Sequence, residues 1–220
     1  MNNLSKLHLK IFEDMNDDEI NECLSKLNYS FKKYKKGETI FNSGEYVNQL
    51  GIILSGSTNI ERVNFLGKRT ILTNVDANDI FNEAYSLLDN QILLVDHVAS
   101  SDTYVIILDV SNIYNISYNE AIYKLIKNLL KLSLHKSIML SKRSFCIANK
   151  TIRERVISYL DLKSREFKSN EFDIPFDRED FADDLNVDRS ALSNELSKMQ
   201  DDGLIKFRKN HFIIKTGISD

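Results

Sequence analysis

FDREDFADDLNVDRSALSNELSKMQDDGLI, the stretch from Phe176 to Ile205, predicts two short helices joined by a tight turn. Asp177 and Asp188 favour helix N-termini, and each precedes apolar residues at helical spacing. Asn186 lies in the turn, where asparagine tolerates the left-handed backbone conformation that such a turn often needs. Gly203 ends the second helix. The expected inward-facing residues are Phe181, Ala182 and Leu185 in the first helix and Ala191, Leu192, Leu196 and Met199 in the second.

The second helix carries polar side chains on the face opposite its apolar residues. They are Arg189, Ser190, Ser193, Asn194 and Glu195. In a DNA-binding helix-turn-helix the second helix enters the major groove, and its N-terminal residues contact base edges. Arginine pairs bidentately with guanine, asparagine pairs with adenine, and serine bonds to several bases. The face is therefore either a surface that reads DNA or the solvated side of an ordinary helix.

The same stretch resembles the helix-turn-helix of the cyclic-AMP receptor / fumarate-nitrate regulator (Crp/Fnr) superfamily of bacterial transcription factors. The residues that carry the resemblance are Arg189, Leu192, Ser193, Leu196, Lys198, Met199 and Gly203-Leu204-Ile205. It implies that Arg189, Ser190 and Asn194 read bases in double-stranded DNA. It also implies that Ser193 and Lys198 contact the DNA backbone. RNA polymerase is a further candidate partner of such a regulator.

The residues after the second helix predict a wing. Residues 204–207 and 211–214 read as strands of a hairpin whose tip is Arg208-Lys209-Asn210. Arg208 and Lys209 are placed to contact phosphates, which position a protein on DNA without specifying sequence. A simple solvated turn is the alternative. Upstream, Thr151 and Glu154 form a capping box that opens a helix ending near Phe167.

Charge and composition give the broad class of protein. The 220 residues carry a net charge of −3, which argues mildly against DNA binding, although the field at one face matters more than the sum. No apolar run approaches the roughly 18 residues that span a bilayer, and no signal peptide is visible, so we expect a cytoplasmic protein without membrane contact. Cys23 and Cys146 fit neither a disulfide framework nor a metal-ligand spacing, and we expect no metal or cofactor.

The first half of the chain has the pattern of an antiparallel sheet domain. Residues 31–111 alternate short apolar runs with Gly37, Gly44, Gly51, Gly56 and Gly67. Residues 34–56 and 66–72 resemble the β-roll of the same superfamily. The predicted fold class is α+β, with a β-roll under an N-terminal helical cover (1–112), a long dimerisation helix (113–147) and a winged helix-turn-helix (148–220).

Residues 79–84 fall where the superfamily places its ligand-binding segment. In nucleotide-binding members a glycine precedes the glutamate of this segment, and an Arg-Ser pair follows. Here Asn82 stands in place of that glycine, Glu83 and Ala84 follow, and the arginine is missing; Asp96 and His97 lie nearby in sequence instead. An acid repels a cyclic phosphate, so we expect no binding of cyclic AMP or cyclic GMP in the family's manner. A small organic effector, a peptide or no effector all stay open, and the cysteine cluster of iron–sulfur members is absent.

A long helix is expected to open with a capping box at residues 117–120 and to run to about Ser144. Its apolar stripe is either a core face packed on the roll or the seam of a homodimer, and the resemblance favours the seam. The expected seam residues are Tyr118, Ile122, Leu125, Leu129, Leu132 and Met139.

Three functions follow. The first is a homodimeric, sequence-specific transcription regulator that binds a palindromic site. The second is a member of the superfamily that needs no ligand and is switched by its abundance or by a protein partner. The third is an enzyme, which the sequence disfavours because it shows no nucleophile with a nearby base, no phosphate loop and no metal set.

Overall fold

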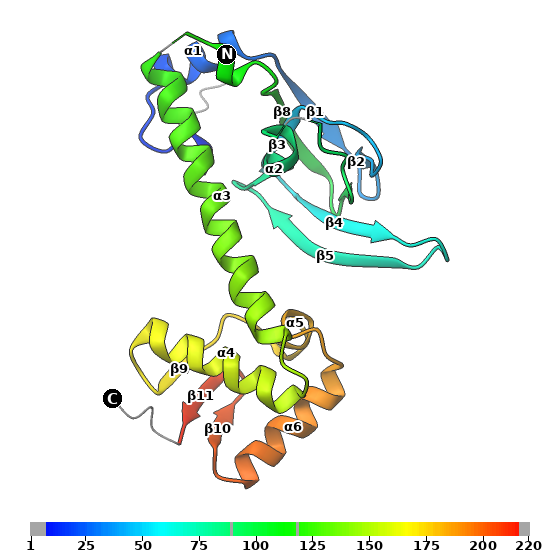
Figure 1. Ribbon diagram of the computed structural model, residues 1–220, viewed down its shortest axis with the longest axis vertical. Helices are drawn as coiled ribbons and strands as arrows, with labels where there is room; N and C mark the ends of the chain where they lie inside the picture. The colour runs from blue at the N-terminus through cyan, green and yellow to red at the C-terminus, as the bar shows by residue number, and fades with distance from the viewer. Residues whose placement is uncertain (1–7, 89, 118, 216–220) are drawn as a thin grey trace. The chain divides into compact units, whose positions relative to one another are not determined.

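The computed structural model describes residues 8–88, 90–117 and 119–215 (Figure 1). The chain divides into two compact units, Met1–His135 and Lys136–Asp220. The boundary falls inside the long helix α3 (Glu120–Ile147), which therefore contributes residues to both units. The expected combination of an antiparallel N-terminal domain, a long helix and a C-terminal helix-turn-helix is confirmed.

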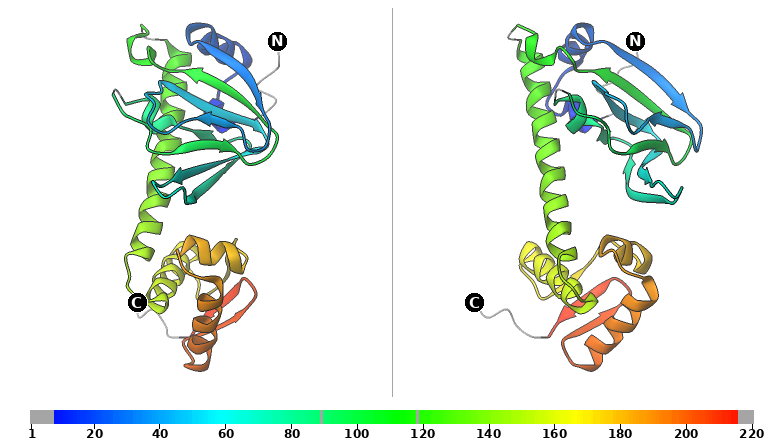
Figure 2. Two further views of the ribbon diagram at one scale, coloured as in Figure 1. Left: turned by 90° about the vertical axis from the view of Figure 1, so that its right-hand side faces the viewer. Right: turned by 45° about the vertical axis from the view of Figure 1, so that its right-hand side comes forward.

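The first unit is a roll of two four-stranded sheets in which every pairing is antiparallel (Figure 2). One sheet has the strand order β1 (Tyr29–Tyr34), β8 (Thr103–Asp109), β3 (Gln49–Ser55) and β6 (Ile80–Phe81). The other has the order β2 (Thr39–Phe41), β7 (Asp96–Ala99), β4 (Ser57–Val63) and β5 (Arg69–Asp76). The shorter elements of this unit are η2 (Lys10–Phe12), α1 (Asp17–Lys26), α2 (Glu83–Ser86) and η3 (Ile113–Asn115).

Two glycines of the roll are required by their surroundings. A Cβ atom on Gly51 would lie 2.1 Å from Cζ of Phe81, whose ring is fully buried against this strand. Gly56 joins β3 to β4 with φ +81°, and a Cβ atom there would lie 2.4 Å from the carbonyl oxygen of Asp102. Both positions are closed to larger residues unless the roll moves.

The roll has apolar cores on its two sides. Its interior is filled by Phe41, Ile53, Val75, Phe81, Leu93, Val105 and Ile107. The outer face of β3 and β8 is covered by α1, η2 and α3, and Cys23 lies fully buried in this second core. Burial raises the pKa of Cys23 to about 12.

Helix α3 begins later in the chain than the sequence predicts. It begins at Glu120, and the side chain of Asn119 accepts a hydrogen bond from the backbone N–H of Ile122 at 3.1 Å. This is the contact that an N-cap residue makes. The N-cap therefore lies at Asn119, two residues after the expected Ser117, and the expected box does not form there because the third helical residue is Ile122. Tyr118 lies outside the described residues.

The predicted stripe of α3 faces the chain's own roll. Ile122, Leu125 and Leu129 are buried in the core that α3 shares with β3 and β8, and Leu132 packs against it. A side chain covered within one chain is not available to a partner, so the seam assignment is wrong for Ile122, Leu125 and Leu129. Leu132 is only partly buried, so its place in a seam stays a prediction. Met139 is exposed. The exposed apolar residues of α3 are Tyr123, Leu130, Leu134, Ile138, Met139, Leu140 and Phe145.

The second unit is a three-helix bundle with a small sheet. Its helices after α3 are α4 (Ile152–Phe167), α5 (Arg178–Asp184) and α6 (Arg189–Asp201), and its strands β9 (Glu171–Asp173), β10 (Ile205–Arg208) and β11 (His211–Ile214) form an antiparallel sheet in the order β10-β11-β9. Thr151 and Glu154 make the expected capping box at the start of α4. Burial in the core of this unit raises the pKa of the Cys146 thiol. Among the described residues, no helix is both long and apolar enough to cross a membrane.

Candidate nucleic-acid interface

Helix α6 is fixed by its cap and by its buried face. The side chain of Asp188 accepts hydrogen bonds from the N–H groups of Ser190 at 2.8 Å and Ala191 at 2.9 Å. Leu192, Leu196 and Met199 are buried in the core of the unit. Since these three residues point inward, Arg189, Ser190 and Asn194 are exposed on the opposite side, and Ser193 is half-buried.

The turn between α5 and α6 has the geometry expected from the sequence. Asn186 has a φ of +53°, so it does adopt the left-handed conformation. The N–H of Val187 donates to the carbonyl of Ala182 at 2.9 Å, and the N–H of Asn186 donates to Asp183 at 3.1 Å. These two bonds form a Schellman motif, which stops α5 and turns the chain toward α6.

Two of the polar side chains on α6 are already engaged. Glu195 is half-buried and lies 2.6 Å from Nε of Arg153, which also reaches Asp202 at 2.7 Å. Glu195 therefore joins α6 to α4 instead of belonging to the outer face. The hydroxyl of Ser190 lies 2.5 Å from Oδ1 of Asp188. Arg189 in the first turn and Asn194 in the second remain as exposed hydrogen-bond donors.

The wing presents Arg208, Lys209 and Asn210 at the tip of the β10–β11 hairpin. Lys209 has a φ of +55°, which closes the turn. Asn210 fastens the tip to the strand before α5, because its backbone carbonyl accepts from the N–H of Ile174 at 2.9 Å and its side chain donates to the carbonyl of Ile174 at 3.1 Å. Arg208 and Lys209 are exposed, as a phosphate contact requires.

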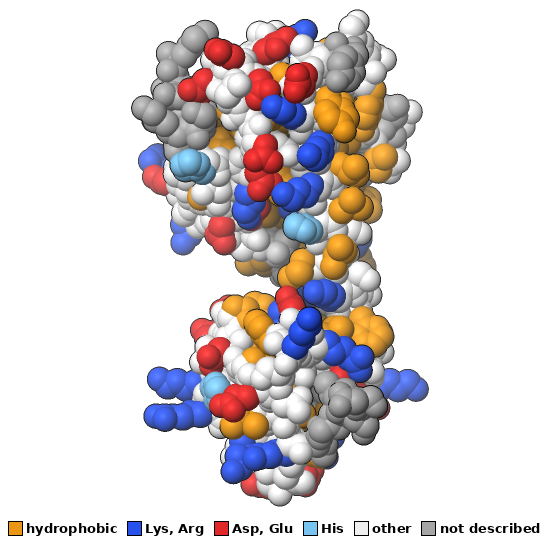
Figure 3. All heavy atoms as spheres, turned by 90° about the vertical axis from the view of Figure 1, so that its left-hand side faces the viewer, with side chains coloured by type: hydrophobic (Ala, Val, Ile, Leu, Met, Phe, Trp, Pro, Cys, Tyr) orange, Lys and Arg blue, Asp and Glu red, His pale blue; other side chains and the backbone are white. Residues whose placement is uncertain are grey.

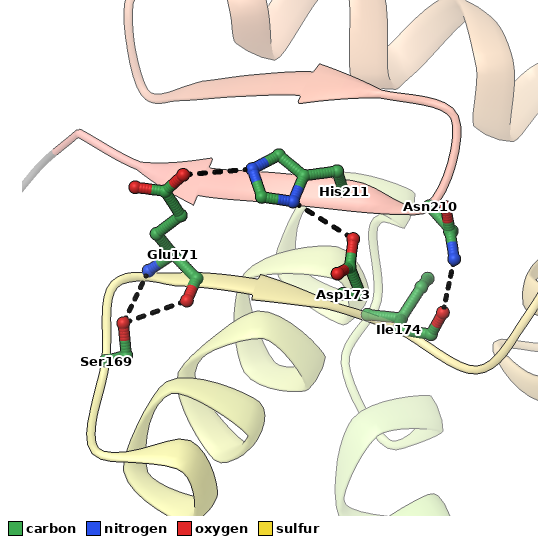
Figure 4. Close-up of polar contacts among 6 residues, drawn as sticks. All are labelled: Ser169, Glu171, Asp173, Ile174, Asn210 and His211. Atoms are coloured by element: carbon green, nitrogen blue, oxygen red, sulfur yellow. Dashed lines mark hydrogen bonds and ion pairs between the residues drawn. The ribbon is translucent and has the colours of Figure 1, made fainter.

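His211 and Arg178 both make contacts that hold the wing. His211 lies 3.0 Å from Asp173 and 3.2 Å from Glu171, both on β9 (Figure 4). The hydrogen bond with Asp173 is the main cause of a raised pKa for His211. Arg178 donates to the carbonyl of Lys209 at 3.0 Å and lies 5.2 Å over the ring of Phe207. Burial, with a smaller contribution from Arg189, lowers the pKa of Arg178.

The sequence analysis did not find the arginines that support this surface from outside the helix-turn-helix. They are Arg143, Arg153 and Arg155. Each makes contacts with residues 30 or more positions away. The one signal in the sequence is that these arginines lie near the ends of predicted helices, and that does not identify their partners.

The predicted effector segment is a closely packed part of the roll. Asn82 is buried with φ +66°, so it occupies a left-handed position that suits glycine. Its Nδ2 atom donates to the carbonyl of Gln49 at 2.8 Å, while its Oδ1 atom is buried with no hydrogen-bond partner among the described residues. Glu83 is also buried, whereas Ala84 is exposed.

Asp96 and His97 both make contacts within the roll. Asp96 accepts a hydrogen bond from the N–H of Ser43 at 2.8 Å, which ties β7 to the loop after β2. His97 is buried in the roll, where its ring centroid lies 5.0 Å from that of Phe81 and 5.9 Å from that of Phe41. A cavity of about 550 Å³ lies elsewhere in the first unit, between η2 and α3, and none of the predicted effector residues lines it. Within residues 8–88, 90–117 and 119–215, no group of three or more His, Cys, Asp or Glu side chains is arranged to hold a metal ion.

Comparisons with known proteins identify both halves of the chain. The family model of the cyclic nucleotide-binding domain matches residues 31–117, and that of the Crp-like helix-turn-helix domain matches residues 154–216. No curated protein matches the chain in sequence.

Solved structures share the fold at low sequence identity. CprK in complex with OCPA is 13% identical, with 84% of this chain and 86% of that chain covered and a TM-score of 0.62. The c-di-GMP responsive regulator CLP of Xanthomonas campestris is 15% identical over 92% of this chain and 100% of that chain, with a TM-score of 0.56. FixK2 from Bradyrhizobium japonicum is 18% identical over 86% and 93%, with a TM-score of 0.50.

A roll of the cyclic nucleotide-binding type followed by a winged helix-turn-helix defines a transcription regulator that binds DNA. The chain belongs to the Crp/Fnr family. Members of this family are regulators of transcription and not enzymes.

Proposed function

We propose that the protein binds a two-fold symmetric DNA site as a homodimer. In this proposal Arg189, Ser190 and Asn194 contact base edges, while Ser193, Lys198, Arg208 and Lys209 contact the DNA backbone. The observation that carries it is the exposed first turn of α6, which has a capped N-terminus and a fully buried opposite face. The hydroxyl of Ser190 donates to Asp188 and can still accept a hydrogen bond from the amino group of a base.

The homodimer is supported by the outer face of α3. Tyr123, Leu130 and Leu134 lie seven and four positions apart, so they share one face of the helix, and each is more than half exposed. Hydrophobic side chains gather in a column over α3 in the first unit (Figure 3). Successive residues of a helix are rotated by about 100°, so this face points away from Ile122, Leu125 and Leu129, which pack on the roll. A second copy of the same face is a self-complementary partner.

The effector is not cyclic AMP or cyclic GMP in this proposal. Asn82 puts a side chain where a phosphate would approach the backbone, and Phe81 and Leu93 fill the interior of the roll behind it. A different small effector, which would meet Asn82, Glu83, Ala84, Asp96 or His97, stays compatible with the fold. So does a member that works in the cytoplasm without any ligand and is controlled by its abundance, by a protein partner or by RNA polymerase.

The experiment that tests the DNA-binding proposal is selection from a random duplex pool, with the purified full chain and no added ligand. We expect enrichment of a site whose two halves are related by two-fold symmetry and spaced by about one helical turn. Enrichment of an asymmetric sequence by a folded, monomeric protein would contradict the homodimer. If a folded dimer enriches nothing, an effector or a protein partner is missing, and control by abundance alone is wrong.

A further inference from the structure

Two arginine side chains from outside the helix-turn-helix bind the carbonyl oxygens at the end of α5. Arg143, on α3, donates through Nη2 to Asp183 O at 2.9 Å and through Nε to Asp184 O at 3.1 Å. Arg155, on α4, donates through Nη1 to Leu185 O and to Asn186 O, both at 3.0 Å. Four consecutive carbonyl groups are therefore held by two guanidinium groups.

The physical basis of this clamp is the chemistry of a helix C-terminus. The last carbonyl groups of a helix lack partners within the helix, and the helix dipole makes this end negative. A guanidinium group is always charged and has donors in a rigid fork, so one arginine can satisfy two neighbouring carbonyls. Asp183 and Asp184 at the same helix end add negative charge, and Nε of Arg143 lies 3.8 Å from Oδ1 of Asp184.

Arg155 is itself held by hydrogen bonds, and Arg143 lies close in sequence to a buried residue. Nε of Arg155 donates to the carbonyl of Asn149 at 2.9 Å, and the side chain of Asn149 donates to Ser158 on α4 at 2.9 Å. The α3–α4 connection and the α5–α6 turn thus share one arginine. Arg143 lies three residues before Cys146, which is buried in the core of the unit.

The clamp lies one residue from the recognition helix. Only Val187 separates Asn186, whose carbonyl Arg155 holds, from Asp188, which caps α6. We propose that Arg143 and Arg155 are positioning residues for specific DNA binding, which fix the turn so that the first turn of α6 meets the base edges. They do so without touching DNA. This inference rests on the base-reading role proposed for α6.

Helix α3 gains a second role from this contact. Its N-terminal half supplies Ile122, Leu125 and Leu129 to the core of the first unit, and its last turns supply Arg143 to the clamp. A change in the last turns of α3 therefore acts on the turn of the helix-turn-helix through hydrogen bonds, and no DNA contact needs to be added or lost.

The test compares Arg143→Met with the matched control Arg165→Met, since Arg165 lies exposed on α4 and pairs only with Asp161 among the described residues. Affinity is measured on the duplex selected by the unaltered protein and on a scrambled duplex, over a series of salt concentrations. We expect Arg143→Met to weaken specific binding roughly tenfold, with little change on scrambled DNA and no change in salt slope. A slope lower by about one would mean that Arg143 contacts a phosphate, and the inference would be wrong.

Hydrogen exchange followed by mass spectrometry tests the clamp without DNA. Peptides that cover residues 182–192 should exchange faster in Arg143→Met and Arg155→Met, because the N–H groups of Asn186 and Val187 are bonded within the clamped turn. In Arg165→Met their exchange rate should equal that of the unaltered protein. Wild-type exchange together with wild-type affinity would overturn the proposal. If Arg143→Met does not fold, Arg143→Lys keeps the charge but loses the fork, and we expect an intermediate effect. Should Arg189→Ala keep full selectivity, the base-reading role of Arg189 is wrong, while the exchange result still decides the clamp.

Discussion

Arg189 is the residue on which base reading depends most in the proposed interface. It is exposed at the first position of α6, and its guanidinium can donate two parallel bonds to guanine. We expect Arg189→Ala to cost about 1–3 kcal/mol of binding free energy and to relax the preference at one base pair in each half-site. Affinities for duplexes with each base substituted in turn measure this. Lys206→Ala is the control, and unchanged selectivity in Arg189→Ala would show that Arg189 does not read a base.

Gly51 shows how strongly one residue depends on its neighbour. The ring of Phe81 occupies the space of a Cβ atom on Gly51, and both residues are fully buried. We expect Gly51→Ala to destabilise the roll by about 1–3 kcal/mol, because the ring must leave its place in a packed core. Adding Phe81→Leu should recover part of this loss. Urea unfolding of the single and double variants measures the coupling, and strictly additive effects would show that the clash is relieved elsewhere.

His211 makes the wing sensitive to pH. Asp173 and Glu171 raise its pKa above the ordinary value for histidine, while Arg208 lies opposite it on β10. A raised folded-state pKa means that the stabilisation is complete below the unfolded-state pKa and is lost as pH rises through the folded-state value. We expect the wing, and with it DNA affinity, to weaken over this pH range. The comparison is with His211→Gln, which should lack this component; an identical pH profile in the variant would contradict the role.

At the scale of elements, α3 is both a core helix and the proposed seam. Leu134 lies on the exposed face, more than half accessible, so a charge placed there would be buried against a second copy. We expect Leu134→Glu to weaken self-association at least about tenfold, as measured by sedimentation. Leu140→Glu is the matched control, because Leu140 is also an exposed leucine of α3 but lies at a different angle around the helix. If both variants stay fully dimeric, the seam lies on another surface.

The same helix shows what the sequence predicts and where it stops. The apolar period of residues 122–132 predicts a buried face, and that face is buried. A period alone does not identify the covering surface, so the chain's own roll was mistaken for a partner. The turn at Asn186, the cap at Asp188 and the exposure of Arg189 and Asn194 follow from local patterns, and the structure has them as predicted.

The features that the sequence does not predict are polar contacts between residues far apart in the chain. The helical period places Glu195 on the outer face, whereas the structure pairs it with Arg153, which lies 42 positions earlier in the chain. Arg143 reaches its carbonyl partners across 40 and 41 positions. Periodicity and capping signals extend over a few residues, so they carry no information on which distant groups a flexible, charged side chain will meet.

At the scale of the whole molecule, the two compact units have separate cores and separate expected ligands. Calorimetric titration with cyclic AMP and cyclic GMP should give no binding. The side chain of Asn82 lies where a phosphate would approach the backbone, and Phe81 and Leu93 fill the interior of the roll. The same sample titrated with the selected duplex is the control and should bind. Micromolar binding of either nucleotide would show that the roll opens, and would contradict the proposal.

The two cysteines have a practical consequence. Cys23 and Cys146 are buried, one in each unit, and burial raises the pKa of both thiols, so neither presents a thiolate to a maleimide dye. Phe65, at the tip of the β4–β5 hairpin, is 96% exposed. A fluorophore attached through Phe65→Cys should therefore label one place in each chain with the native cysteines left in position. Energy transfer between a donor-labelled and an acceptor-labelled copy would then report assembly and its response to DNA in a single cuvette.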